Sequence, residues 1–129
     1  MNPVGWWTLH FDWGLSGNYQ WIQIYFNFDG TFAYLAGANE GSWVLSDDII
    51  ILRFKRSPAS ENNTIYSGEA TRNFMSGAMM SADGERGHWF ALKKSTKVYS
   101  LKEKTTLPYL VDKESKPKID VAGNKITMQ

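Results

Sequence analysis

Apolar and polar residues alternate along the first part of the chain, up to about residue 93. In GWWTLHFDW at 5–13, the odd positions from 7 onward are apolar and the even positions from 8 onward are polar. Between 19 and 28 the even positions from 22 onward are apolar, and we expect all of them, including Phe28, to face one side. Because successive side chains of a β-strand point to opposite faces, both stretches are predicted to be half-buried strands.

Short turn-forming sequences divide this region into about eight strands. They are predicted at 5–13, 19–28, 31–36, 41–45, 49–55, 64–70, 73–81 and 87–93. The Asp29-Gly30 pair is a strong hairpin signal because glycine accepts the positive φ of a tight turn. No segment before residue 93 has a helical repeat. Many short strands joined by tight turns are typical of a sandwich or an up-and-down antiparallel barrel. We favour the all-β barrel, because closure removes both sheet edges.

The charge changes sign after the patterned region. Residues 1–92 contain five Lys or Arg and nine acidic residues, net −4, whereas 93–129 contain nine Lys and four acidic residues, net +5. The sequence therefore predicts a barrel domain at 1–93 and a Lys-rich C-terminal extension at 94–129, with a hairpin at 118–127. The extension either stays solvated, binds an acidic partner, or folds back on its own acidic barrel through the apolar segment LPYLV at 107–111.

Composition limits the classes of function. A chain of 129 residues is the size of one domain, and its net charge of +1 gives no basic excess for binding nucleic acid. The absence of cysteine excludes disulfides and thiol chemistry. No apolar run approaches the ~20 residues of a membrane helix. The first residues lack the basic and apolar regions of a signal peptide, so a cytoplasmic location is expected.

A Gly-x-Trp pattern occurs three times, as Gly5-Trp6-Trp7, Gly41-Ser42-Trp43 and Gly87-His88-Trp89. Each copy lies at or near a predicted strand start. Residues two apart in a strand share a face, so the glycine is expected to leave room for the indole that follows it. Three copies predict related packing at three points of one barrel.

The Gly5-x-Trp7 copy and several later motifs give the chain a family resemblance. The later motifs are FDGTF at 28–32, GSW at 41–43, YSG at 66–68, MSGAM at 75–79 and GHWFA at 87–91. The chain resembles the calycin superfamily of lipocalins, fatty-acid-binding proteins and avidins, and within it the compact lipocalin-like bacterial domains. The resemblance covers 1–93 and implies an up-and-down barrel that holds a small ligand. The Thr-Asp-Tyr motif and later arginine of lipocalins are missing, and the biotin contacts of avidins have no matching positions.

Strand alternation also predicts which side chains line the barrel interior. If the odd face of the first strand points inward, a cup for a small apolar ligand is lined by Trp7, Phe11, Ile24, Tyr34, Trp43, Tyr66, Met75, Met79 and Trp89. Tyr34 and Tyr66 would then supply the few polar contacts that orient the ligand. An eight-stranded barrel is also small enough for side chains to fill it, with both hydroxyls satisfied at the rim. Both alternatives remain open.

The opposite face is unusually apolar. Its predicted outward residues are Trp6, Trp21, Tyr25, Ile49, Ile51 and Phe74. A contiguous apolar patch of this size indicates an interface with a second copy, a protein partner or the chain's own extension. The alternative function is therefore a protein-interaction or assembly module with a filled interior, which uses this face and the basic extension.

The sequence gives little support for catalysis. His10 and His88 fall on outward positions, where they are expected to be ordinary surface residues, and no nucleophile triad or metal-ligand spacing is present. We therefore expect a non-catalytic protein without a cofactor or metal. Some calycin-like barrels are decarboxylases or cyclases with internal Arg, Glu and Tyr, so the resemblance leaves Arg53 and Glu69 as the residues of a less favoured enzyme alternative.

Overall fold

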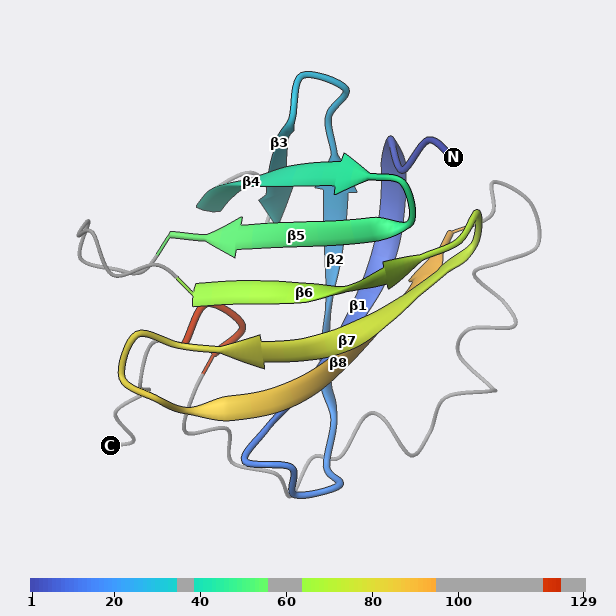
Figure 1. The fold of residues 1–129 in the computed structure, drawn as a ribbon. Helices are drawn as coiled ribbons and strands as arrows, with labels where there is room; N and C mark the ends of the chain where they lie inside the picture. Colours follow the sequence, from blue (N-terminus) through green and yellow to red (C-terminus); the bar gives the residue numbers. More distant parts are fainter. Residues whose placement is uncertain (35–38, 56–63, 95–119, 124–129) are drawn as a thin grey trace.

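The computed structural model describes residues 1–34, 39–55, 64–94 and 120–123. Figure 1 shows its strands, which are β1 (Gly5–Trp13), β2 (Gln20–Phe26), β3 (Thr31–Tyr34), β4 (Asn39–Ser46), β5 (Ile49–Phe54), β6 (Thr64–Ala70), β7 (Phe74–Met80) and β8 (Arg86–Lys93). The described residues contain no helix, and hence none that is long and apolar enough to span a membrane. All eight predicted strands are present, with ends that differ by a few residues.

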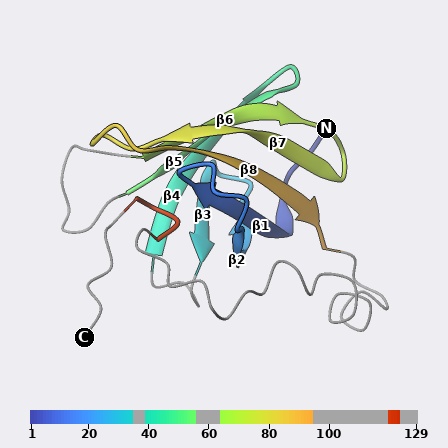
Figure 2. The same cartoon turned by 90° about the horizontal axis from the view of Figure 1, so that it is seen from below.

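The strands form a closed up-and-down barrel in which every strand is antiparallel to its neighbours. β8 closes the barrel by pairing with β1 over its whole length, from Trp7 opposite Lys93 to Trp13 opposite Gly87. In Figure 1, β4 to β7 pass in front of β1 and β2, and Figure 2 shows β6 and β7 across the barrel from β2 and β3. The predicted barrel is thus confirmed.

Local hydrogen bonds explain the tight turn between β2 and β3. Gly30 has φ of 91°. The Asp29 carboxylate accepts hydrogen bonds from the backbone N–H of Thr31 at 3.1 Å and from its hydroxyl at 2.7 Å. The predicted role of the Asp-Gly pair is confirmed. The prediction for Phe28 was wrong, because β2 ends at Phe26 and the Phe28 side chain lies in the turn, 86% exposed.

Strand alternation sorts the side chains into a core and an outer surface. In β5, Ile50, Leu52 and Phe54 are buried, while Ile49 and Ile51 are exposed. The wider core is built from inward positions of every strand except β4, whose Trp43 and Leu45 are partly buried against it. Its residues are Trp7, Leu9, Phe11, Ile24, Phe26, Phe32, Tyr34, Ile50, Leu52, Phe54, Tyr66, Ala70, Met75, Met79, Trp89 and Ala91, with Val121 and Ala122 added from beyond the barrel. Burial of these apolar side chains is the main source of stability.

In two of the Gly-x-Trp copies, the atoms nearest to the glycine belong to neighbouring strands. A Cβ on Gly41 would lie 2.3 Å from Cζ of Phe32 and 2.4 Å from the carbonyl oxygen of Arg53. A Cβ on Gly87 would lie 2.6 Å from Cε of Met79. The expected room for the indole that follows stays a prediction. These glycines allow close approach of groups from neighbouring strands, which any larger side chain would prevent.

Candidate functional site

The nine residues predicted to line a ligand cup all lie in the barrel interior. Trp7, Phe11, Ile24, Tyr34, Tyr66, Met75, Met79 and Trp89 are buried, and Trp43 is half-buried against the core. Aromatic rings contact one another across the interior, with centroid distances of 4.8 Å for Phe32–Phe54, 4.6 Å for Phe54–Tyr66 and 5.7 Å for Tyr66–Trp89. These are distances of direct ring packing. Among the described residues, the predicted cup is thus a packed aromatic cluster.

The indole N–H groups of the interior are used by the fold itself. Trp7 Nε1 donates to the carbonyl of Pro3 at 2.8 Å, and Trp43 Nε1 donates to that of Asn27 at 2.9 Å. Trp89 Nε1 shares its proton between two carbonyls of β6 and β7, at 3.2 and 3.1 Å. A buried donor needs such an acceptor. These three tryptophans therefore act as structural anchors, and ligand binding in the interior stays a prediction.

A short segment from the C-terminal extension covers one end of the barrel. We call this end the mouth, and define it by Trp13, Thr64 and Tyr66. Figure 1 shows the segment 120–123 beside the start of β6. Within it, Val121 and Ala122 are 3% and 1% exposed, as inaccessible as the barrel core. Of the predicted hairpin at 118–127, only this turn lies within the described residues.

Three side chains of the mouth donate hydrogen bonds to three successive carbonyls of the turn. Trp13 Nε1 donates to residue 120 at 2.8 Å, the Tyr66 hydroxyl to residue 121 at 2.7 Å, and the Thr64 hydroxyl to residue 122 at 2.5 Å. Burial, followed by the nearby Tyr34 and Asp120, raises the pKa of Tyr66 well above its usual value. Tyr66 thus stays protonated and able to donate. The sequence could not reveal this contact, because 55 residues separate the partners.

The predicted outward residues do face outward, but they do not form one surface. Trp6, Trp21, Ile49, Ile51 and Phe74 are exposed, and Tyr25 is half-buried against Trp6 with a centroid distance of 5.1 Å. The first strands carry three of these residues, whereas the two isoleucines lie on β5. β5 is four strands from β1 in either direction around the barrel. The expected contiguous patch was therefore wrong; the residues form groups on opposite walls.

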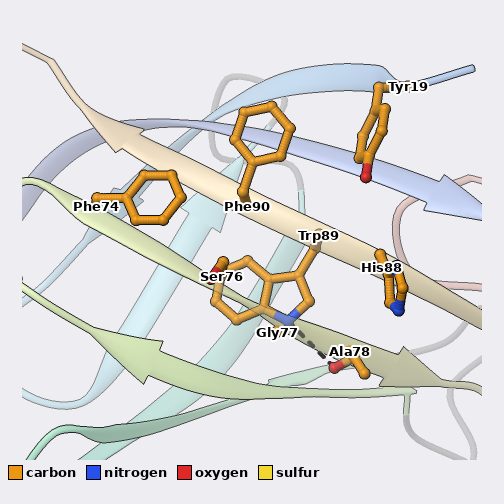
Figure 3. Close-up of a pocket in the computed structure, with 8 residues that line it drawn as sticks. All are labelled: Tyr19, Phe74, Ser76, Gly77, Ala78, His88, Trp89 and Phe90. Atoms are coloured by element: carbon orange, nitrogen blue, oxygen red, sulfur yellow. Dashed lines mark hydrogen bonds between the residues drawn. The ribbon is translucent and has the colours of Figure 1, made fainter. Parts of the chain in front are cut away.

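A groove lies on the outer wall over β7 and β8, with a volume of about 660 Å³. Its lining residues are Tyr19, Phe74, Ser76, Gly77, Ala78, His88, Trp89 and Phe90. Figure 3 shows Phe74, Phe90 and Tyr19 following one another along one edge. Their rings are in contact, at 6.3 Å for Phe74–Phe90 and 5.2 Å for Tyr19–Phe90. Small side chains of β7 leave the groove open beside this aromatic edge.

Of the groove residues, the sequence had predicted Phe74 as an outward contact residue and Trp89 as part of the lining of an interior cup. The outward position of Phe90 followed from the inward position of Trp89, since neighbouring residues in a strand alternate. Tyr19 precedes β2 and reaches the groove from the connection between β1 and β2. Its position depends on the path of that connection, which periodicity does not determine.

His10 lies beside this aromatic edge and is fully buried, although its strand position faces outward. Its ring stacks on Phe90 with centroids 4.4 Å apart, and neither ring nitrogen has a hydrogen-bond partner. Burial lowers the pKa of His10 to about 4. The prediction of an ordinary surface histidine was wrong for His10, whereas His88 is exposed as expected. At neutral pH, His10 therefore acts as an uncharged ring packed behind the groove.

The described residues offer no metal centre, because they contain no group of three or more His, Asp or Glu side chains that could hold an ion. The Asp12 carboxylate is used locally, where it accepts hydrogen bonds from the N–H groups of Ser16 at 3.0 Å and Gly17 at 2.7 Å. Arg53 and Glu69, which the enzyme alternative required inside the barrel, are exposed on outward strand positions. Their placement does not support that alternative.

The closed eight-stranded antiparallel barrel has the architecture that the calycin resemblance implied. Comparison with known proteins gave no match to a family model, to a curated protein or to a solved structure. The fold is therefore established at the level of a closed up-and-down barrel, and membership of the calycin superfamily stays a prediction.

Proposed function

We propose that this protein is a non-catalytic binding barrel that contacts a polypeptide partner through the aromatic groove on β7 and β8. The observation that carries the proposal is the row formed by Phe74, Phe90 and Tyr19 beside small residues on the outer wall. Aromatic side chains that gather at an open surface are typical of protein contact sites, where they supply large apolar area with few rotatable bonds.

The shape of the groove favours a polypeptide over an enclosed small ligand. Small-molecule sites commonly bury 70–90% or more of a drug-sized ligand, which requires a concave cup. The groove instead lies open on a strand surface, with Phe74 42% exposed at one end and His88 exposed. Such a surface suits one or two apolar side chains of a partner, held between the aromatic edge and the small residues of β7.

Charge narrows the chemistry of the partner. The barrel sequence at 1–92 has a net charge of −4. Opposite charge on two partners speeds their encounter and disfavours wrong partners. We therefore expect a polypeptide whose apolar contact residues are flanked by Lys or Arg. A second copy of this chain, with its basic extension, belongs to this class.

The interior receives less support as a ligand site. Its aromatic rings pack against one another at 4.6–5.7 Å around Tyr66. In addition, the turn at 120–123 covers the mouth. A small apolar ligand inside the barrel would have to displace these contacts before it gained any of its own, so the predicted interior ligand ranks second.

A displayed library of random linear peptides tests the proposal. Peptides selected on the wild-type protein are expected to carry apolar residues next to Lys or Arg. Their affinity should fall about tenfold or more in Phe74→Ser, which corresponds to about 1.4 kcal/mol. Phe74 is exposed, so this variant should keep the fold.

Ile49→Ser is the matched control, because Ile49 is 48% exposed on β5, two strands away from β7, and does not line the groove. Its affinity for the selected peptides should equal that of the wild type. Equal binding by Phe74→Ser, or a loss confined to Ile49→Ser, would contradict a contact site on β7 and β8. Failure to select any peptide would also count against it.

A further inference from the structure

The contacts at the mouth recognise the backbone of the turn at 120–123 more than its side chains. Trp13, Thr64 and Tyr66 donate to three successive carbonyl oxygens, and they come from the end of β1 and the beginning of β6. Within the described part of the extension, the side chains buried with these carbonyls are those of Val121 and Ala122, which are small. Three convergent donors and a small apolar contact are the elements of a binding site for a short peptide.

We propose that the mouth of the barrel is a peptide-binding site, filled here by the chain's own turn at 120–123, and that it accepts the same turn from a separate peptide. The occupant is a turn with three consecutive carbonyls that accept hydrogen bonds from the mouth, small apolar residues and a glycine at its end. This proposal does not depend on the groove of β7 and β8, since the two sites share none of their contact residues.

The donors of the mouth require acceptors. Tyr66 is fully buried, Thr64 is 0% exposed, and the Trp13 ring packs edge-on against Tyr66 with a centroid distance of 6.3 Å. A buried donor without an acceptor costs free energy. Departure of the turn would leave these three donors to water, and a ligand that supplies carbonyl oxygens in the same places is expected to displace that water.

Glycine at position 123 gives the site its sequence preference. Gly123 has φ of 85°, and a Cβ there would lie 2.6 Å from Oγ1 of Thr64 and 3.2 Å from Cβ of Ser81. The turn is held in shape by a hydrogen bond from the Gly123 N–H to the carbonyl of Asp120 at 3.0 Å, and by one from the Ala122 N–H to the Asp120 carboxylate, also at 3.0 Å. The preferred peptide therefore contains Asp-Val-Ala-Gly, and residues larger than glycine are excluded from its last position.

The full-length variant Gly123→Val tests the proposal, because the change lies in the turn and leaves every barrel residue intact. A synthetic peptide with the sequence of residues 118–125 is titrated into it by calorimetry. We expect saturable binding with one peptide per chain. Binding to the wild type should be weaker by about 100-fold or more, because the tethered turn competes at an effective concentration in the millimolar range.

Three controls separate site binding from other effects. The same peptide with Val in place of its glycine should not bind Gly123→Val. The variant Gly84→Val is a control for backbone strain, because Gly84 has φ of 92° and a Cβ there would meet no atom within 4 Å. It should bind the peptide as weakly as the wild type does. Adding Tyr66→Phe to Gly123→Val should weaken peptide binding about tenfold, because one donor is lost.

Two results would overturn the proposal. One is a folded Gly123→Val protein, checked by circular dichroism, that binds no peptide; the other is equal binding of the glycine peptide and its Val version. If Gly123→Val does not fold, Gly123→Ala replaces it, since a single methyl group meets the same Thr64 contact. Failure of both variants to fold would mean that the turn is an inseparable part of the core, which also overturns the proposal.

Discussion

The ring of His10 is as inaccessible as any residue of the core, although it sits on the outer wall of β1. Phe90 from β8 stacks on this ring, with centroids 4.4 Å apart. A histidine in this position loses water without gaining a hydrogen-bond partner, so its neutral form is strongly favoured. At the scale of single residues, burial and not strand position decides what a titratable group does.

His10 should therefore make the stability of the protein depend on pH. The pKa of His10 is about 4 in the folded protein and 6.5 in the unfolded chain, so the unfolded chain binds more protons between these values. The stabilisation is complete above pH 6.5 and is lost as the pH falls towards 4. Relative to His10→Phe, the wild type should lose about 3 kcal/mol of unfolding free energy over this range.

Urea unfolding at a series of pH values measures this difference. His88→Gln is the control, because His88 is exposed and its replacement should leave the pH dependence of the wild type unchanged. Parallel pH profiles for the wild type and His10→Phe would show that His10 titrates normally in the folded protein.

Gly77 and its cross-strand neighbour Gly68 illustrate a second effect at this scale. A Cβ on Gly77 would lie 1.9 Å from the carbonyl oxygen of Ser67 on β6. Gly77→Ala should therefore destabilise the protein by about 3 kcal/mol or more, since the clash is with backbone that cannot rotate away. Thermal unfolding measures the effect. Ala78→Ser, at the next and exposed position, should unfold within a few degrees of the wild type, and a similarly small effect of Gly77→Ala would disprove the close approach.

At the scale of elements, alternation alone predicted nearly every strand and its inward face. β5 is the clearest case, with three isoleucines in succession of which only the middle one is buried. Ile50 is 0% exposed and Ile51 is 40% exposed. Hydrophobicity does not distinguish these residues, but the two-residue period of the strand does.

This register predicts unequal effects of identical substitutions in β5. Ile50→Ala should cost about 2–5 kcal/mol because it leaves a cavity in the core. Ile51→Ala should cost less than about 1 kcal/mol, since its side chain is already partly in water. Chemical denaturation of both variants gives the comparison. Equal losses, or a larger loss for Ile51→Ala, would mean that the register of β5 is shifted by one residue.

Sequence patterns were less informative where contacts join distant segments. The connection that carries Tyr19 to the groove and the turn at 120–123 in the mouth both depend on the path of the chain in three dimensions. The predicted interior residues were correct because each depends only on its own strand. The predicted outer patch was wrong because Trp6 and Ile49 share an orientation but lie on strands on opposite sides of the barrel.

At the scale of the whole molecule, a packed interior is combined with the contact surfaces that we propose at the mouth and on the outer wall. The aromatic cluster from Phe26 through Phe54 to Trp89 supports the barrel from within. Aromatic side chains that pack against one another stabilise the folded state. An empty cavity in the same place would lower the free energy of unfolding until a ligand filled it. We therefore propose that binding involves Phe74 and Phe90 on the outer wall and Tyr66 at the mouth.

Xenon binding tests this central claim most directly, because xenon enters empty apolar cavities and binds there. A crystal of the full-length protein is pressurised with xenon, and the anomalous signal locates each bound atom. We predict no xenon among Trp7, Phe32, Phe54 and Trp89 inside the barrel. A well-occupied xenon atom at that position would reveal an interior cavity, contradict the packed core and restore the small apolar ligand as the leading function.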